Sequence, residues 1–425
     1  MKQKCKSALS LALAAVLIFG SASPPASAAD AAFSAEKMGA GVSAALIENV
    51  PKGGLKLGSS EGDWTAVALA RAGCIASDVY GSYYSNVAKE VKSCKGVLSE
   101  NKYTEYSRVI LGLTAVGRDP RTIGGYDLVQ PLADYEKVIH QGTNGPIWAL
   151  IALDSGEYDV PKLKGSDGTQ NSRERMVDAI LSDEIGKGTA SVGGWALSGS
   201  EPDPDITAMA LQALSNYRSR SDVQAAVGRA VKVLSKLQNS RGGYSSWGTE
   251  NSESTAQVVV ALTGLGISPD SKDFVKNGHT LISALAEYYL PGEGFKHLRS
   301  DSSPNGMATD QCACAVAAYN RFQSKQNPLY DMSDTVVAGE NSGTPTFVSD
   351  TTENFSVSGS YLFKITSKNG KVPAFAVGTP GVFAEKLAEV VGGNYYFQIK
   401  AIGSVGAKAG IYINGKKVVV AEVGD

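Results

Sequence analysis

The segment Asp205-Ile-Thr-Ala-Met-Ala-Leu211 is one copy of a pattern that recurs along this 425-residue chain. The pattern begins with a residue typical of a helix N-terminus, carries a small or hydroxyl residue two positions later, and continues as a run of Ala, Val and Leu. The copies start 42, 39, 61, 48 and 54 residues apart, and each interval has room for two helices and two loops. The other copies are Asp63-Trp-Thr-Ala-Val-Ala-Leu69, Glu105-Tyr-Ser-Arg-Val-Ile-Leu111, Asn144-Gly-Pro-Ile-Trp-Ala-Leu150, Glu253-Ser-Thr-Ala-Gln-Val-Val259 and a weaker one from Met307.

The recurring segments are apolar on nearly all sides, which is typical of a helix that is buried all round. Between them, apolar residues fall at helical spacing opposite Lys, Arg and Glu, which predicts amphipathic outer helices. Six buried inner helices that alternate with six outer ones predict a mainly α protein, in which residues 31–325 form a closed (α/α)6 toroid of six helical hairpins. The expected outer helices are Phe33–Val50, Tyr83–Val97, Leu128–Ile139, Arg173–Glu184, Asp222–Gln238 and Lys272–Tyr289.

The C-terminal part of the chain has the pattern of a β domain. Residues 326–345 are rich in Asn, Ser, Gly and Pro, which predicts a linker. Short apolar or alternating runs follow, and Asn414-Gly415 between two of them is a strong hairpin signal. We therefore expect a small immunoglobulin-like β-sandwich over residues 346–425. Its expected strands are Phe355–Val357, Tyr361–Thr366, Phe375–Val377, Tyr395–Ile402, Ile411–Ile413 and Val418–Ala421.

Residues 1–28 have the features of a secretory signal peptide. Lysines at positions 2, 4 and 6 precede the apolar stretch Leu9–Phe19, and a small-residue cleavage pattern ends near Ala28. The apolar stretch is too short to span a bilayer, and no later run reaches the roughly 18 apolar residues that a spanning helix needs. We therefore expect a secreted or cell-surface protein with no membrane insertion, for which association with the cell wall stays open.

Composition narrows the classes of function. Hydrophobic residues make up 43% of the chain and charged residues 19%, which fits a large buried core. The formal net charge of −2 argues against a basic nucleic-acid-binding surface. Four cysteines lie beyond the leader, and after export they could form disulfides or stay as buried thiols. They are Cys74, Cys94, Cys312 and Cys314.

Two stretches combine a Gly-Gly-aromatic step with the start of a repeat copy. One is Leu237-Gln238-Asn239-Ser240-Arg241-Gly242-Gly243-Tyr244, followed by Ser254-Thr255-Ala256, and the other is Gly193-Gly194-Trp195 with Asp205-Ile206-Thr207-Ala208-Met209. They resemble the Gln-to-Gly-aromatic repeat of the superfamily of squalene–hopene and other class II terpene cyclases, protein prenyltransferase β-subunits, and the cobalamin carriers transcobalamin and intrinsic factor. The resemblance covers about residues 31–325 and implies the toroid. It does not decide the function, because these relatives include both enzymes and carriers.

One motif of this chain can be compared directly with the cyclases. Their acid motif is Asp-x-Asp-Asp followed by Thr-Ala, and the matching run here is Asp203-Pro204-Asp205-Ile206-Thr207-Ala208. Ile206 replaces the third acid, which removes part of the support that keeps such a carboxylic acid protonated and oriented. In a cyclase-like enzyme, Asp205 and Asp203 would be the catalytic residues. The simpler interpretation is that one of them caps the inner helix.

The resemblance to prenyltransferases implies a zinc site. These enzymes hold zinc with an Asp-x-Cys pair and a His on a later helix, and Asp310-Gln311-Cys312 has the form of the pair. However, His140, His279 and His297 all precede it and lack ligand spacing. We therefore expect no metal site, and we expect Cys312 to belong to the core.

The cobalamin carriers join an α/α toroid to a small C-terminal β domain and bind their ligand between the two. This chain has the same order of parts, so the resemblance leaves a corrinoid as one candidate ligand. No motif indicates another cofactor.

The N-termini of the inner helices are expected to gather around one mouth, where aromatic and polar side chains suit a small organic molecule or a sugar. Arg108 interrupts an apolar helix, so we expect it to reach either an acid or this mouth. The predicted ligand-binding residues are Trp64, Tyr106, Arg108, Trp148, Trp195, Asp205, Thr207, Tyr244, Trp247 and Glu253.

These observations predict an exported or cell-surface protein that binds a small organic ligand or glycan, rather than an enzyme. A class II terpene cyclase-like enzyme with a degenerate acid motif is the first alternative. The further alternatives are a purely structural surface protein and a secreted glycan-active enzyme with paired carboxylates. Candidates for that pair are Asp203, Asp205, Glu250 and Glu253.

Overall fold

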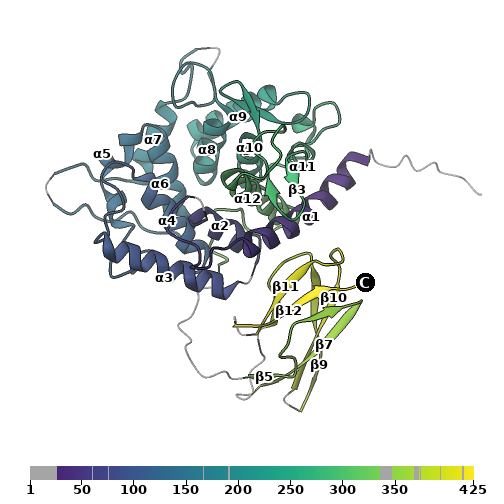
Figure 1. Ribbon diagram of the computed structural model, residues 1–425. Coiled ribbons are helices and arrows are strands. Elements are labelled where there is room, and N and C mark those ends of the chain that lie inside the picture. The colour runs from purple at the N-terminus through teal and green to yellow at the C-terminus, as the bar shows by residue number, and fades with distance from the viewer. Residues whose placement is uncertain are drawn as a thin grey trace, which may run out of the picture.

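The computed structural model describes residues 26–59, 61–74, 76–165, 167–189, 192–335, 347–367, 375–392, 394–413 and 416–425, together with Pro373. Within them, an N-terminal region of twelve α-helices is followed by a C-terminal region of two four-stranded sheets (Figure 1). Residues 1–25, which hold most of the predicted signal peptide, and residues 336–346, which hold the end of the predicted linker, lie outside the described residues. Each helix in the described part is too short or too polar to cross a bilayer.

The six copies of the repeat mark six helix N-termini, as predicted. Asp63 and Asn144 are the first residues of their helices, and Glu105, Asp205, Glu253 and Met307 are each the second. Most side chains of these helices are buried, in agreement with their apolar sequences. We call them the repeat helices: α2 (Asp63–Arg71), α4 (Thr104–Ala115), α6 (Asn144–Ser155), α8 (Pro204–Leu214), α10 (Ser252–Gly264) and α12 (Gly306–Gln323).

Each repeat helix packs against the repeat helices before and after it in the chain. Thus α4 contacts α2 and α6, α8 contacts α6 and α10, and α12 contacts α10. In addition, α12 contacts α2, although their sequences are more than 200 residues apart. One large hydrophobic core joins all six helices.

The hydroxyl residue of the repeat has a structural role that its position alone did not reveal. The Thr207 hydroxyl donates to the Trp195 carbonyl at 3.1 Å and accepts from the Trp195 N–H at 2.9 Å. Thr309 binds the backbone of Phe295 in the same way, and Thr255 accepts from the N–H of Tyr244. The hydroxyl therefore ties the loop aromatic to the first turn of the helix that follows.

Glycine precedes the aromatic residue because this tie brings the loop very close to the helix. Gly194 and Gly294 both have positive φ, of 79° and 137°, a region that favours glycine. A Cβ on Gly294 would lie 2.5 Å from Oγ1 of Thr309, and one on Gly194 would lie 3.0 Å from Oγ1 of Thr207. The Gly-Gly-aromatic step is thus a consequence of the Thr contact.

The intervening helices are α1 (Ala26–Glu48), α3 (Ser77–Ser93), α5 (Tyr135–Val138), α7 (Arg173–Ser182), α9 (Ser221–Leu237) and α11 (Leu281–Ala286). Of these, α1 and α3 begin earlier than predicted, α9 is shifted by one residue, and α5, α7 and α11 are shorter than predicted. The longest fully described one, α9, buries Val223, Ala226, Val227, Ala230 and Leu234 on one face, as an amphipathic helix does.

Two predicted outer helices are wrong in extent. The stretch Leu128–Ile139 is divided because Asp134 is extended, forms a β-bridge with Gln170, and caps α5 through a bond from the Glu136 N–H. In Lys272–Tyr289 only α11 is α-helical. Asn277 has a positive φ of 51°, and Thr280 starts α11 with a capping box to Ser283.

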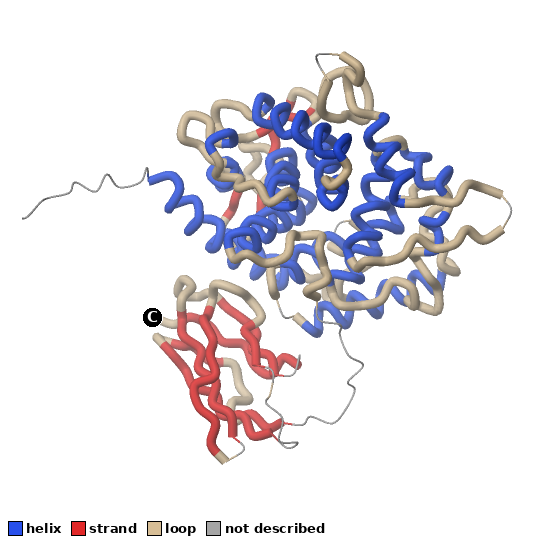
Figure 2. Tube along the Cα trace, turned by 180° about the vertical axis from the view of Figure 1, so that it is seen from behind, coloured by secondary structure: helices blue, strands red, loops and turns tan. Residues whose placement is uncertain are grey.

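The C-terminal region is a sandwich of two sheets around a second hydrophobic core. One sheet has the order β5-β7-β10-β9 and the other β6-β12-β11-β8. Figure 2 shows these strands gathered in one body beside the helices. The strands are β5 (Phe347–Ser349), β6 (Phe355–Val357), β7 (Ser360–Ser367), β8 (Phe375–Val377), β9 (Phe383–Val391), β10 (Asn394–Ala401), β11 (Lys408–Ile413) and β12 (Lys416–Val423).

All six predicted strands are present, and two further strands, β5 and β9, were missed. The predicted turn Asn414-Gly415 lies outside the described residues, between β11 and β12, which pair antiparallel. Short strand pairs also occur among the helices, where β1 (Tyr244–Ser246) pairs with β2 (Thr249–Asn251), and β3 (Tyr289–Leu290) with β4 (Gly294–Phe295).

The β region contacts the helical region beside the C-terminal end of α2. Asp78 of α3 accepts bonds from Nζ of Lys417 at 2.6 Å and from the Tyr412 hydroxyl at 3.3 Å. A Cβ added to Gly73 would lie close to Pro380, and one added to Gly381 would lie close to Ala40. These contacts are at the end of α2 remote from its N-terminal residue Asp63.

The first part of the predicted linker is packed under the helices rather than extended from them. Arg71, at the end of α2 and 3% exposed, donates to the carbonyls of Leu329, Pro328 and Asp331. It also pairs with the Asp334 carboxylate at 2.7 Å. One buried guanidinium therefore holds residues 328–334 in place.

Replacing Arg71 should test this anchor. We expect Arg71→Met to lower the free energy of unfolding by about 3 kcal/mol, because it leaves the buried carbonyls of this segment without their donor and leaves Arg321 as the remaining partner of Asp334. Arg121→Met, which removes the exposed pair with Asp119, should cost less than about 1 kcal/mol. Urea unfolding of both variants measures the difference, and equal losses would contradict the proposed role of Arg71.

Candidate functional site

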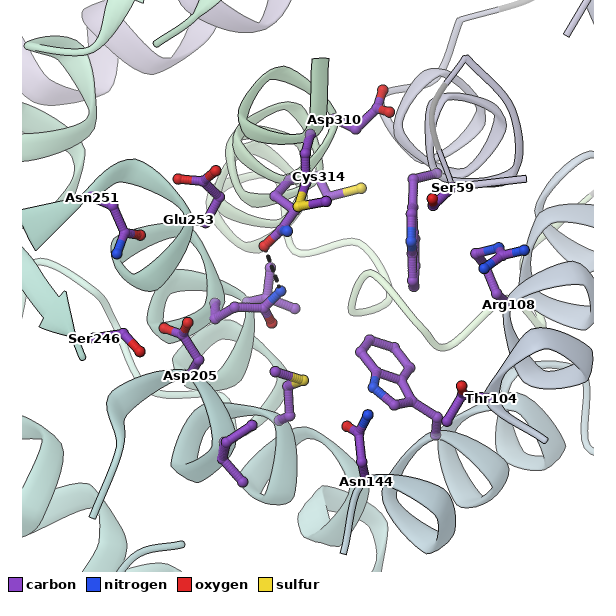
Figure 3. Close-up of a pocket in the computed structure, with 18 of the residues that line it drawn as sticks. Ser59, Thr104, Arg108, Asn144, Asp205, Ser246, Asn251, Glu253, Asp310 and Cys314 are labelled. Atoms are coloured by element: carbon purple, nitrogen blue, oxygen red, sulfur yellow. Dashed lines mark hydrogen bonds between the residues drawn. The ribbon is translucent and has the colours of Figure 1, made fainter. Parts of the chain in front are cut away.

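A cavity of about 640 Å³ lies where the N-terminal halves of the six repeat helices meet (Figure 3). Every repeat helix contributes to its wall, and the described residues that line it all come before position 331. The lining residues on the repeat helices are Trp64, Thr104, Arg108, Asn144, Trp148, Asp205, Ile206, Met209, Glu253, Gln257, Val260, Met307, Asp310, Gln311 and Cys314.

One wall of the cavity is aromatic. The rings of Trp64 on α2 and Trp148 on α6 are tilted against each other with centroids 5.2 Å apart. The ring of Tyr330 meets Trp148 edge-on at 6.1 Å. Two indoles and a phenol thus form a continuous apolar surface, of the kind that binds sugar rings, organic cations and hydrocarbons.

Tyr330 also closes the bottom of the cavity. It belongs to the segment held by Arg71, and it lines both this cavity and a smaller one of about 60 Å³ on the other side. Val260 of α10 is shared by the same two cavities. The chain that leaves α12 therefore contributes to the wall of the cavity beneath the N-terminal halves of the repeat helices.

The carboxyl groups of Asp205, Glu253 and Asp310, from α8, α10 and α12, also line the cavity (Figure 3). The pKa of Asp205 is raised to about 6 by burial and by the negative charges of Asp203 and Glu253, which together outweigh the lowering by the Ser254 hydroxyl. One oxygen of Asp205, Oδ1, is buried without a hydrogen-bond partner. This carboxyl group thus lines the cavity without a cationic partner among the described residues.

Asp310 is even more enclosed. Its side chain is 3% exposed, and its Oδ1 accepts a bond from the Thr65 hydroxyl at 2.8 Å. The pKa of Asp310 is raised to about 7, because burial and the charge of Glu61 together outweigh the lowering by the Thr65 hydrogen bond. Near neutral pH this carboxyl group therefore exists in both protonation states.

Glu253 has a histidine partner at the mouth. Nδ1 of His297 lies 2.8 Å from Oε1 and 2.9 Å from Oε2 of Glu253, and the Ser252 hydroxyl donates to Oε2 at 3.0 Å. Behind them, the side chain of Gln257 joins Gln212 to Gln311 by two bonds of 3.0 Å. These contacts fix the relative positions of α8, α10 and α12.

Arg108 lines the cavity and also pairs with acids, so both expected roles are present. Its Nε donates to Oδ2 of Asp63 at 2.8 Å, and its Nη2 to Glu105 at 2.5 Å. Asp63 is fully buried and also accepts a bond from the Tyr83 hydroxyl at 2.6 Å. The positive charge of Arg108 is thus already shared between two carboxylates.

Three exposed apolar side chains surround the opening. Trp247, in the turn between β1 and β2, is 80% exposed and has a positive φ of 52°. Leu197 and Met307 are more than half exposed. Such exposed apolar groups at the rim of a cavity are typical of a ligand entrance.

The structure brings six of the predicted ligand-binding residues into the cavity wall and leaves four out. Trp64, Arg108, Trp148, Asp205, Trp247 and Glu253 line it. Thr207, Trp195 and Tyr244 are fully buried in the loop-to-helix ties, where the Trp195 indole donates to the Ile180 carbonyl and the Tyr244 hydroxyl to the Leu234 carbonyl. Tyr106 is 3% exposed, and its hydroxyl bonds the backbone of Leu98 and Ser99.

Asp203 is also absent from the wall. Its Oδ1 accepts bonds from the N–H groups of Asp205 and Ile206, and its Oδ2 from the Ser246 hydroxyl. It is the N-cap of α8, which agrees with the simpler interpretation of the Asp-x-Asp motif. Glu250 binds Arg241 and Arg299 and does not line the cavity either.

Several lining residues were missed. Asp310 and Gln311 were considered only for zinc, and His297 only as a distant zinc ligand. A signal for Asp310 was available, since it lies one helical turn after Met307 and so on the same side of α12. Nothing in the sequence placed Tyr330, because it lies in a stretch with linker composition.

A zinc ion does not fit the residues that suggested it. Among the described residues, no group of three or more His, Cys, Asp and Glu side chains is arranged to hold a metal ion. Asp310 is bonded to Thr65, Cys312 is fully buried, and His297 is bonded to Glu253. Cys74, Cys94, Cys312 and Cys314 are all free thiols, and burial raises the pKa of Cys74 to about 12.

In comparisons with known proteins, no protein-family model and no curated protein matches the chain. Its function is therefore argued from the cavity itself.

The titration of Asp310 gives a testable effect on stability. Its pKa is raised from an ordinary value of 3.8 to about 7, so between these values the folded protein holds a proton that the unfolded chain has lost. Stability therefore falls as pH rises through this window. Asp310→Asn keeps the acceptor for Thr65 but cannot ionise, so it should reduce the difference in unfolding free energy between pH 5 and pH 8 by on the order of 2 kcal/mol.

Urea unfolding at the two pH values measures this difference. The control is Asp273→Asn, which changes an exposed acid and should leave the wild-type pH dependence intact. If Asp310→Asn keeps the wild-type pH dependence of the unfolding free energy, Asp310 ionises in the folded protein without loss of stability, and the prediction is contradicted.

Proposed function

We propose that the protein is an exported or cell-surface binding protein whose cavity holds a small organic ligand or glycan. The observation that carries this proposal is the cavity of about 640 Å³, whose wall combines tryptophans with carboxyl groups. Its volume is within the range of sites for drug-sized molecules, which combine apolar walls with a few fixed polar groups. The exposed rim of Trp247, Leu197 and Met307 supports access from solvent.

We further propose that the repeat helices form the inner ring of a closed (α/α)6 toroid, related in fold to the terpene cyclase, prenyltransferase and cobalamin-carrier superfamily. The contact of α12 with α2 supports closure, because it joins the first and last copies of the repeat. The Gly-Gly-aromatic steps with their Thr partners support the relationship.

The β region has a different part in this proposal from the one that the cobalamin carriers imply. Its described contacts are with α1, with α3 and with the connection between α2 and α3, and the described β residues do not line the cavity. We infer an immunoglobulin-like module that supports the helical region, for example at the cell wall. A corrinoid held between the two parts is therefore not favoured.

Extraction of bound compounds tests the binding proposal. Mature protein incubated with culture extract and repurified should carry a small molecule that mass spectrometry detects after denaturation. Trp148→Leu should reduce its recovery at least tenfold, because the substitution keeps apolar volume but removes the ring that joins Trp64 to Tyr330.

The matched control is Tyr396→Ala, a partly exposed aromatic residue of β10 outside the cavity, which should not change recovery. Recovery of no compound by the wild type, together with equal behaviour of both variants, is the result expected of a purely structural surface protein and would refute the proposal.

One observation favours a second candidate, a cyclase-like enzyme. The Asp205 carboxyl group has an unpartnered oxygen in the cavity wall and a pKa raised to about 6, as a general acid needs. Incubation with squalene and shorter polyprenes should then give cyclic products that Asp205→Asn abolishes and Asp273→Asn preserves. If the wild type forms product and Asp205→Asn does not, a cyclase-like enzyme is favoured over a binding protein. If the wild type forms no product, this candidate is excluded for these substrates.

A further inference from the structure

The charged groups of the cavity are unbalanced. Among the described lining residues there are three carboxyl groups, Asp205, Glu253 and Asp310, and Arg108 is the one Arg or Lys. Arg108 already pairs with Asp63 and Glu105, so it adds no free positive charge. The cavity therefore has a surplus of acid that the protein itself does not neutralise.

Asp205 and Asp310 face no cationic side chain among the described residues. Asp205 faces Asp203, Glu253 and the Ser254 hydroxyl, and its Oδ1 is buried without a partner. Asp310 faces Thr65 and Glu61. Two acids that are mostly buried, and whose neighbours are neutral or also acidic, are stabilised when a ligand brings a positive charge.

The aromatic wall is also without a cation from the chain. Within the described residues, the Arg and Lys side chains that stack on rings do so on Tyr84, Tyr103, Tyr135, Tyr158 and Tyr288, none of which lines the cavity. Trp64, Trp148 and Tyr330 have no such partner. Indole is the best aromatic surface for a cation, above all for a quaternary or protonated amine.

The helix N-termini do not compensate by offering an anion site. Their N–H groups carry partial positive charge, but on the helices that carry the three carboxyl groups they are occupied by the protein's own side chains. Asp203 caps α8, Asn251 caps α10 and Asn305 caps α12. An anionic ligand would have to displace these caps and approach the three carboxyl groups.

We propose that the cavity selects organic cations: its ligand carries an amine or quaternary ammonium group that the carboxyl groups and the tryptophan faces of the cavity bind together. This inference rests on the proposed binding function and specifies the chemical class of the ligand. The carboxyl groups supply charge and the indole faces supply cation–π contact, so both kinds of side chain favour the same group.

Two probes of equal shape test the selection. Choline and 3,3-dimethyl-1-butanol differ only by the exchange of the charged nitrogen for carbon. We expect titration calorimetry or ligand-observed NMR on the full-length mature protein at low ionic strength to show at least tenfold tighter binding of choline. Asp205→Asn and Asp310→Asn should each weaken choline binding several-fold and leave the neutral alcohol unchanged, whereas Asp273→Asn should change neither.

The pH dependence gives a second readout, because the charge of choline does not titrate. Asp205 and Asp310 ionise as pH rises through about 6 and about 7, so choline affinity should increase from pH 5 to pH 8. The other charged groups that face the site are Asp203, Glu253 with His297, Glu61 and Arg108 with its two acids. The double variant Asp205→Asn/Asp310→Asn should lose most of this increase.

The outcomes separate this inference from the binding proposal. Equal binding of choline and its neutral isostere, or recovery of a neutral or anionic compound from the extract, overturns the selection for cations and leaves the binding function standing. Absence of any bound compound and of binding by both probes overturns both.

Discussion

The second half of the helical region depends on one contact, in which the hydroxyl of a Thr in the first turn of a helix binds the backbone of an aromatic residue in the preceding loop. It is present at Thr207, Thr255 and Thr309. The contact ties each aromatic residue to the start of α8, α10 or α12, and at Gly194 and Gly294 it leaves little room for a side chain before the aromatic residue. The N-terminal halves of these three helices line the cavity together with those of α2, α4 and α6.

Acidic residues near these N-termini follow from the same geometry. The first turn of a helix favours a negative charge, and α2, α4, α8 and α10 each carry an acid there. What happens to each acid depends on its neighbours. Asp63 is satisfied by Arg108 and Tyr83, whereas Asp205 keeps an unpartnered oxygen in the cavity wall. Only the second kind of acid lacks a cationic partner among the described residues.

The repeat helices and their N-termini could be predicted from the sequence because apolar residues on all sides and glycine-rich loops are local signals. The local sequence did not indicate which aromatic residue faces the cavity. Trp148 faces it, whereas Trp195 is buried outside the cavity and its indole bonds Ile180. The strand β9 was missed because Phe383–Val391 contains Ala, Glu, Lys and Leu without strict alternation, and nearly all of its residues are exposed. Tyr330 could not be found because Arg71, 259 residues earlier, is what holds it in place.

The position of Tyr330 has a consequence for any polymeric ligand. Since Tyr330 lines both this cavity and the smaller one, its side chain stands between the two among the described residues. We expect a long glycan or polyamine that enters from the mouth to meet this side chain and to engage with a terminus or a short side branch. Binding would then depend on the number of polymer ends rather than on the length of the polymer. Shortening such a polymer would therefore raise the number of ends that can bind per unit mass without changing the affinity of each end.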